Sequence, residues 1–152
     1  MTKKQVIRIT KQFHFEAAHV LWGYDGLCKN IHGHSYILYV TLKGYAIEDD
    51  SDPKNGMLMD FSVLKSIINE LIVHPMDHAL LINKNSPHKE LLNLTQFTEK
   101  LIALPYQPTC ENMIADFASR IIERLPKGIE LYSLKLHETS TSFAEWFQDD
   151  NR

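Results

Sequence analysis

The hydrophobic pattern of this chain changes its period once, and that change limits the folds open to it. Before position 49, apolar and polar residues alternate, as they do in half-buried β-strands. A loop dense in turn-forming residues follows at 49–56. After this loop, apolar residues recur every three or four positions, as on one face of a helix. This change of period predicts an α+β fold in which helices cover one face of an antiparallel sheet.

Four strands are predicted, and they lie in two pairs at the two ends of the chain. The first has apolar residues at odd positions between 7 and 15, and the second has them at even positions of 34–43. The other two strands are expected near 132–138 and 143–147. A four-stranded antiparallel sheet of this kind leaves two edges and one face open, and association with further copies would cover them.

Two helices are predicted between the strand pairs, which gives the order ββααββ. Asp60 is a suitable N-cap for the first helix, and Pro75 should end it. Thr109 can cap the second helix, which Pro126 and Gly128 should stop. The expected buried faces of the two helices consist of Val63, Leu64, Ile67, Ile68, Leu71 and Ile72, and of Met113, Ile114, Phe117, Ala118, Ile121, Ile122 and Leu125.

A single domain is expected over all 152 residues, with an extra helical excursion at about 85–107. The net charge of −3 and the pI near 6.2 argue against a basic, nucleic-acid-binding surface. No apolar run approaches the ~20 residues that span a bilayer, and the first ten residues lack the apolar core of an export signal. Two cysteines are too few for a disulfide framework, so the cytoplasm is the expected location.

The strongest local signal is His32-Gly33-His34 at the start of the second strand. Residues two apart on a strand project to the same face, so both imidazoles can converge on one ion. His19, at the end of the first strand, is a natural third ligand if the two strands pair. Three histidines without a fourth protein ligand are typical of an open, catalytic zinc site, whereas an accidental histidine pair is the alternative.

Cys28 lies four residues before His32, and three interpretations of it are open. A thiolate beside a divalent cation has a lowered pKa and can act as a base or a nucleophile. The cysteine can also be a small buried side chain, or a fourth ligand that would make the metal site structural. The turn-like residues Gly23 to Gly26 just before it favour the reactive role.

Two acidic positions complete the set of candidate residues. The neighbours Asp77 and His78 can form an acid–imidazole pair only if the chain bends there, and a solvated turn is the alternative. Glu138 shares its parity with Leu134 and Leu136, so it should face the covered side of the sheet. A carboxylate is unfavourable there unless the strand ends at this point or the carboxylate meets a ligand.

Six short motifs in order resemble one family. They are FHFEAAH at 13–19, CKNIHGHSY at 28–36, GMLMDF at 56–61, MDH at 76–78, PTCEN at 108–112 and HET at 137–139. The family is that of the 6-pyruvoyltetrahydropterin and 6-carboxytetrahydropterin synthases. The resemblance covers nearly the whole chain except the segment 85–107.

The resemblance implies a T-fold in which three subunits close a barrel and two trimers stack into a hexamer, with sites at subunit boundaries. It implies that zinc is held by His19, His32 and His34, and that Cys28 removes a proton from the substrate side chain. Asp77 and His78 would relay protons. The implied pterin-binding residues are Glu138, Thr109 and Glu111, with Glu138 also able to take part in proton relay.

The implied substrate is 7,8-dihydroneopterin triphosphate. Three residues separate Cys28 from His32, which is similar to the bacterial 6-carboxy enzymes of queuosine biosynthesis. This spacing favours 6-carboxytetrahydropterin as the product, with release of acetaldehyde and triphosphate. The alternatives are a pyruvoyltetrahydropterin synthase of tetrahydrobiopterin synthesis and a non-catalytic zinc- or pterin-binding module on the same fold.

Overall fold

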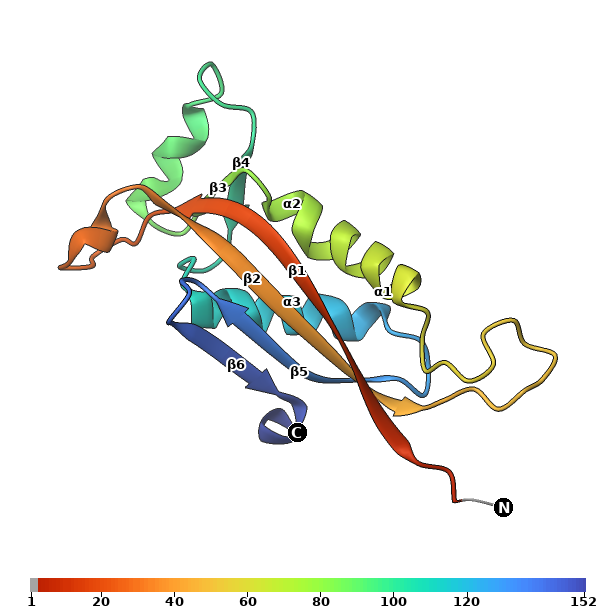
Figure 1. Ribbon diagram of the computed structural model, residues 1–152. Coiled ribbons are helices and arrows are strands. Elements are labelled where there is room, and N and C mark those ends of the chain that lie inside the picture. The colour runs from red at the N-terminus through yellow and green to blue at the C-terminus, as the bar shows by residue number, and fades with distance from the viewer. Residues whose placement is uncertain (1–2) are drawn as a thin grey trace.

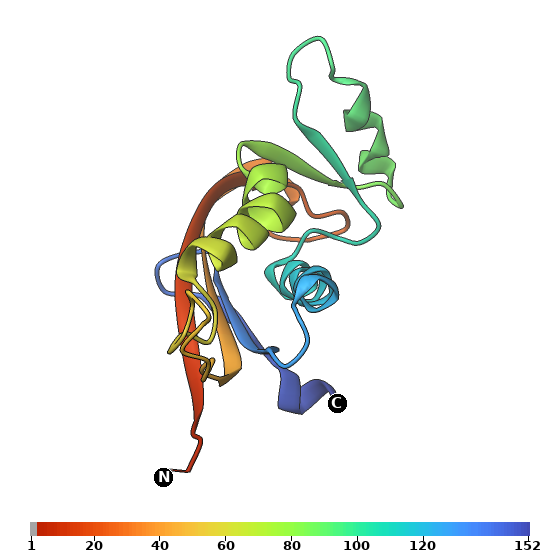
Figure 2. The same cartoon turned by 90° about the vertical axis from the view of Figure 1, so that its right-hand side faces the viewer.

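A computed structural model describes residues 3–152 as one curved sheet with helices on its inner face (Figure 1). The strands are β1 (Val6–His19), β2 (His32–Tyr45), β3 (Ala79–Asn83), β4 (Leu101–Leu104), β5 (Glu130–His137) and β6 (Phe143–Phe147). They lie in the order β4-β3-β1-β2-β5-β6. Figure 2 shows both long helices on the same side of this sheet. The α+β class predicted from the sequence is therefore confirmed.

The four antiparallel strands expected from the sequence form the larger part of the sheet. β1 pairs with β2 along its whole length, from Val6 opposite Tyr45 to His19 opposite His32. β2 pairs with β5, and β5 pairs with β6. The inward residues at odd positions from Phe13 to His19 in β1 and at even positions from Tyr36 to Gly44 in β2 are buried, as the alternation predicted, whereas Ile7 is exposed and Ile9 half-buried. Among the described residues, β3 occupies only the last three positions of the outer edge of β1.

The prediction of a four-stranded, purely antiparallel sheet is wrong because β3 and β4 extend it in parallel. β3 runs parallel to β1 at Ala17–His19, and β4 runs parallel to β3. β3 has the sequence ALLIN and β4 has LIAL, so both are short apolar runs without alternation. A parallel strand covered on both faces reads as such a run, which periodicity alone does not separate from helix.

The predicted helical excursion at 85–107 is only partly helical. A 3₁₀ helix, η3, covers Pro87–Asn93, and Ser86 caps it by accepting a hydrogen bond from the His88 N–H. The second half of the segment is not helical, because it contains β4. In Figure 1 the segment stands at one end of the molecule, beside β3 and away from β5 and β6.

The first predicted helix forms as three consecutive segments, and Pro75 does not close it. α1 (Phe61–Ile68), capped by Asp60, passes into a π-helical turn, η2 (Asn69–Val73), and then into α2 (His74–Met76). Proline cannot supply the N–H that would bond the Leu71 carbonyl in an α-helix. That carbonyl instead accepts a hydrogen bond from Arg120 at 3.1 Å, so the helix continues past the proline.

The second long helix agrees with its prediction. α3 (Cys110–Arg124) begins at Thr109, whose side chain accepts a hydrogen bond from the Asn112 N–H. Its inner face packs on the sheet, and Phe117 contacts Phe15 edge-to-face with 6.0 Å between ring centroids. The exceptions among the predicted apolar positions of the two helices are Ile122 and Val63, which are exposed.

One strand departs from strict alternation. The register of β5 against β2 shifts between Thr41 and Leu42, which leaves Tyr132 as an extra residue. Tyr132 has the same parity in the sequence as Leu134, but because of this shift it packs on the other face of the sheet. Its ring lies under the Arg8 guanidinium, whose central carbon is 4.0 Å from the ring centroid.

Candidate active site

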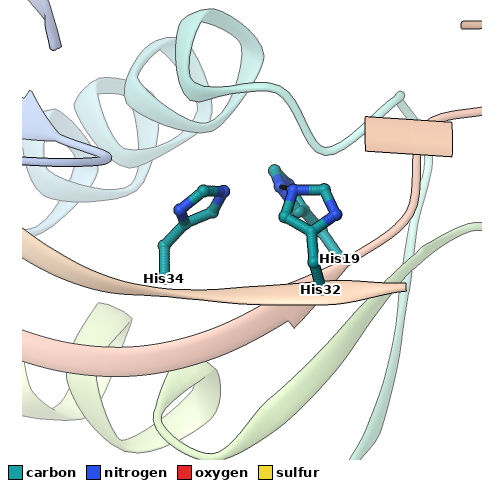
Figure 3. Close-up of side chains that lie close together, drawn as sticks. All are labelled: His19, His32 and His34. Atoms are coloured by element: carbon teal, nitrogen blue, oxygen red, sulfur yellow. Dashed lines mark hydrogen bonds between the residues drawn. The ribbon is translucent and has the colours of Figure 1, made fainter. Parts of the chain in front are cut away.

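Three histidines converge at the end of the β1–β2 ladder. His19 lies directly opposite His32, and His34 lies opposite Ala17, so all three side chains share the covered face of the sheet. Their ligand nitrogens lie within 4.8 Å of one another, and the Nε2 atoms of His19 and His32 are 3.0 Å apart. Figure 3 shows the three rings rising from the two strands toward the same space.

Backbone carbonyls orient two of these rings. The Nδ1 of His19 is 2.6 Å from the Pro108 carbonyl oxygen, and the Nδ1 of His32 is 2.8 Å from that of Asn30. A carbonyl only accepts, so each Nδ1 carries a hydrogen and each Nε2 presents a lone pair. Two lone pairs 3.0 Å apart repel each other unless a cation lies between the rings. This outer-sphere pattern is typical of metal-ligating histidines.

The third ring, that of His34, also has a ring nitrogen without a partner. The Nε2 of His34 is buried and has no hydrogen-bond partner among residues 3–152. Burial lowers the pKa of His34 and of His19, and for both rings the charge of His32 acts in the same direction. The lowered pKa values favour the neutral imidazoles that bind metals. The donor set therefore fits a divalent metal such as zinc, with one coordination position left for a substrate or water.

Glu138 lies beside the three histidines. β5 ends at His137, and the Glu138 Oε1 is 3.8 Å from the Nε2 of His34 and 3.9 Å from that of His19. The carboxylate is partly exposed, so it reaches the site without being enclosed in the core. The strand thus ends at this point, and the side chain still faces the covered side, as its parity predicted.

Asp77 and His78 form a contact pair at the edge of β1. His78 has a positive φ of 61°, and this bend brings its Nδ1 to 3.0 Å from the Asp77 Oδ2. The other carboxylate oxygen of Asp77 accepts a hydrogen bond from the Glu16 N–H at 2.8 Å. This bond, followed by the contacts with His78 and Lys100, lowers the pKa of Asp77. The bend that a relay needs is therefore present.

The cavity beside His78 lies mainly on the other face of the sheet from the three histidines. His78 lines this cavity of about 470 Å³ together with Glu16, Ser35 and Leu80, and His34 lines it as well. The Ser35 hydroxyl donates to the Glu16 carboxylate, and these two residues alternate with inward-facing neighbours. The cavity therefore lies mainly on the outer face of β1 and β2, and it also reaches His34 of the triad.

Comparison with known proteins agrees with this architecture. Residues 8–149 match the 6-pyruvoyl tetrahydropterin synthase family. The chain belongs to this family. It is similar to 6-carboxy-5,6,7,8-tetrahydropterin synthases of Haemophilus influenzae, at 36% identity over 93% of the chain and 99% of the relative, and of Synechocystis, at 32% over 91% and 92%.

Solved structures share the fold at lower identity. An uncharacterized protein of Wolinella succinogenes superposes with a TM-score of 0.75 at 19% identity, covering 95% of this chain and 99% of that one. The 6-pyruvoyl tetrahydropterin synthase of Caenorhabditis elegans gives 0.65 at 23%, covering 97% and 99%. At these identities the likeness concerns the fold of the pterin synthase family and not the residue roles.

Cys28 lies in the loop that joins the two strands bearing the histidines. It belongs to a 3₁₀ turn, η1 (Leu27–Lys29), and is half-buried. The Leu21 N–H donates to its carbonyl oxygen at 3.3 Å, which closes the loop. The cluster of ligand atoms within 4.8 Å contains the three histidines and does not contain this thiol.

Thr109 and Glu111 flank the first turn of α3. Thr109 follows Pro108, whose carbonyl orients His19, and its hydroxyl oxygen caps the helix while its O–H remains able to donate. Glu111 is exposed in the first turn. Both lie on the segment next to the triad, and among the described residues no hydrogen bond joins either side chain to the histidines.

Sequence reasoning missed three contributors to this site. Tyr36 continues the face of His32 and His34, stacks on Phe15, and places its hydroxyl 3.5 Å from the Nδ1 of His19. Burial raises its pKa well above the usual value, so the phenol stays neutral. Its parity could have revealed it. The carbonyls of Asn30 and Pro108 give no sequence signal, because every residue has one.

No helix among residues 3–152 is long and apolar enough to cross a membrane.

Proposed function

We propose that this chain is a zinc-dependent 6-carboxy-5,6,7,8-tetrahydropterin synthase. It converts 7,8-dihydroneopterin triphosphate into 6-carboxytetrahydropterin, acetaldehyde and triphosphate, in the cytoplasm and as part of queuosine biosynthesis. The observation that carries the proposal is that the imidazoles of three histidines converge with nitrogens able to bind a metal, beside the carboxylate of Glu138. The names of the similar bacterial proteins support the carboxy product over the pyruvoyl one.

His19, His32 and His34 would hold the zinc. The ion supplies a positive charge that binds the side-chain hydroxyls of the substrate and makes them more acidic. The Nδ1 hydrogen bonds to Pro108 and Asn30 keep the rings of His19 and His32 in the metal-binding tautomer. Zinc would also separate the lone pairs that face each other across 3.0 Å.

Glu138 would anchor the pterin ring. Its carboxylate can accept from the ring amino group and from the adjacent ring N–H, which form a donor pair of matching geometry. The Glu138 Oε1 lies less than 4 Å from two ligand nitrogens, so the anchored ring would hold its side chain near the metal. Thr109 and Glu111 would assist from the start of α3.

Cys28 would act as the catalytic base. It lies on the loop between the two ligand-bearing strands, so its position depends on the same framework as the metal. In its thiolate form it would take a proton from the substrate side chain, and Asp77 with His78 would pass protons on.

In the proposed site, a second copy of the chain would supply the Asp77–His78 pair. His78 lines a cavity that lies mainly on the other face of the sheet from the triad and reaches the triad only at His34. The outer edge of β1 before Ala17 and the outer edge of β6 lack strand partners among residues 3–152. Edge-to-edge pairing of these strands in successive copies would close a ring of three sheets, and two rings would stack as a hexamer.

One assay tests the activity directly. The purified, zinc-loaded protein is incubated with 7,8-dihydroneopterin triphosphate, and the pterin and acetaldehyde are identified by mass spectrometry. The expected products are 6-carboxytetrahydropterin and an equal amount of acetaldehyde. A pyruvoyl pterin without acetaldehyde would reassign the chain to the pyruvoyl branch, and tight pterin binding without turnover would make it a binding module.

A further inference from the structure

Lys100 contacts the turn that carries the Asp77–His78 pair from two sides. It lies directly before β4, in the second half of the 85–107 segment, and is half-buried. Its backbone carbonyl accepts a hydrogen bond from the Leu80 N–H at 3.0 Å. Its ammonium donates to the carbonyl of His74 at 2.5 Å and also to the carbonyl of Asp77.

One of the two carbonyls that Lys100 binds, that of His74, is left without an intrahelical partner at the helix end, because the His78 N–H donates to Glu16. α2 ends at Met76, and the last carbonyls of a helix have no intrahelical donor. A lysine at this end satisfies them and complements the negative end of the helix dipole. The Asp77 carbonyl belongs to the peptide that joins Asp77 to His78, so its orientation affects both side chains.

The conformation of His78 needs such support. Its φ of 61° lies in the left-handed region, which a residue with a Cβ adopts only where its surroundings hold it. The His78 N–H donates to the Glu16 carbonyl, and the Glu16 N–H donates to the Asp77 carboxylate. Both of these contacts come from β1. Lys100 contacts the turn from the other side, because it precedes β4, which lies on the far side of β3 from β1.

We propose that Lys100 is a positioning residue that holds the Asp77–His78 peptide in the bent conformation required for contact between the two side chains. This inference rests on the proposed function, in which that pair relays protons. It gives the 85–107 segment a role, because the segment delivers Lys100 to the turn. The lysine itself touches neither the substrate nor the metal.

Three variants test the role. Lys100→Met keeps the length of the side chain and removes its three donors, and Lys100→Arg restores donors at nearly the same reach. Lys89→Met is the matched control, because Lys89 is exposed in the same segment and makes no side-chain hydrogen bond or ion pair within residues 3–152. Each variant is measured for amide hydrogen exchange at His78 and for kcat, KM and zinc content.

Lys100→Met should increase the exchange rate of the His78 amide at least about 10-fold over the control. It should lower kcat about 10- to 100-fold, with KM and zinc content unchanged, since a displaced catalytic group affects the chemical step. Lys100→Arg should recover most of both effects. Exchange at His78 and kcat equal to those of Lys89→Met would overturn the proposal, as would a fall in kcat accompanied by loss of zinc.

The exchange measurement also separates this proposal from the proposed function. If the wild-type protein fails to turn over 7,8-dihydroneopterin triphosphate, the function is wrong, but the exchange rate at His78 still reports whether Lys100 holds the turn. If the wild type is active and exchange at His78 is insensitive to Lys100→Met, the function stands and the positioning role is wrong.

Discussion

The histidine triad and the Asp77–His78 pair lie at the same end of the sheet but differ in how they are held. His19 is 1% exposed, and its ring is oriented by a backbone carbonyl. The side chain of His78 is 78% exposed and faces an open cavity. All three histidines of the triad come from one chain, whereas the side chain of His78 is open to solvent. Under the proposed function, metal binding would belong to a single subunit and the complete catalytic site would need two.

The largest expected effect concerns the triad. In the double variant His32→Ala/His34→Ala, zinc should fall from close to one ion per chain to near none, because two of three ligands are removed. His14→Ala is the control, since His14 lies exposed on the other face of β1. Metal analysis of the purified proteins measures the outcome, and wild-type zinc content in the double variant would refute the site.

The second prediction tests whether the two regions come from different subunits. Cys28→Ala and His78→Ala should each retain zinc and lose about 10²- to 10⁴-fold in turnover, the usual contribution of a general base or acid. Unfolding and reassembling the two variants together should restore part of the activity, because some hybrid sites then contain both intact groups. Turnover is measured for the mixed sample and for each variant reassembled alone.

Recovery is not expected if one chain supplies both groups. In that case every site in a hybrid would lack either the thiol or the imidazole. Absence of recovery in a mixture that is shown by mass spectrometry to contain hybrids would therefore contradict the two-subunit site.

The third prediction concerns Glu138, which belongs to the triad region but is not a ligand. Glu138→Gln should weaken pterin binding by about 1.5–3 kcal/mol, the scale of one hydrogen bond to a charged group. Zinc content should not change. Fluorescence titration with a pterin product measures the affinity. Unchanged affinity with reduced turnover would make Glu138 a proton-relay group and not an anchor.

The smallest effect concerns the acid stability of the pair region. The hydrogen bond from the Glu16 N–H, followed by contacts with His78 and Lys100, lowers the pKa of Asp77 in the folded state. Its contribution is therefore present above the unfolded pKa of about 3.9 and is lost as the pH falls through the folded value. Asp77→Asn should flatten the loss of stability between about pH 5 and pH 2.

Urea unfolding at several pH values measures this flattening. Glu99→Gln is the control, because Glu99 is exposed and makes no side-chain hydrogen bond or ion pair within the described part of the chain. A slope in Asp77→Asn equal to that of the wild type would show that the Glu16 contact does not stabilise the folded state.

Alternation and helical period determined most of the fold. The odd face of β1, the even face of β2 and the Thr109 cap of α3 all follow from residue type and spacing. The convergence of His32 and His34 follows as well, because side chains two apart on a strand share a face. The arrival of His19 beside them required only that β1 and β2 pair along their length.

Tertiary structure decided the remainder. Only the fold could show that β3 and β4 are parallel strands, because a short apolar run has no period to distinguish it from helix. The π turn before Pro75 depends on a hydrogen bond from Arg120, which lies 49 residues from Leu71 in the sequence. The left-handed His78 donates its N–H to Glu16, and the carbonyl before it accepts from Lys100, and both partners are distant in the sequence. Such long-range contacts override local preference, which is why residue spacing alone did not predict β3, β4 or the π turn.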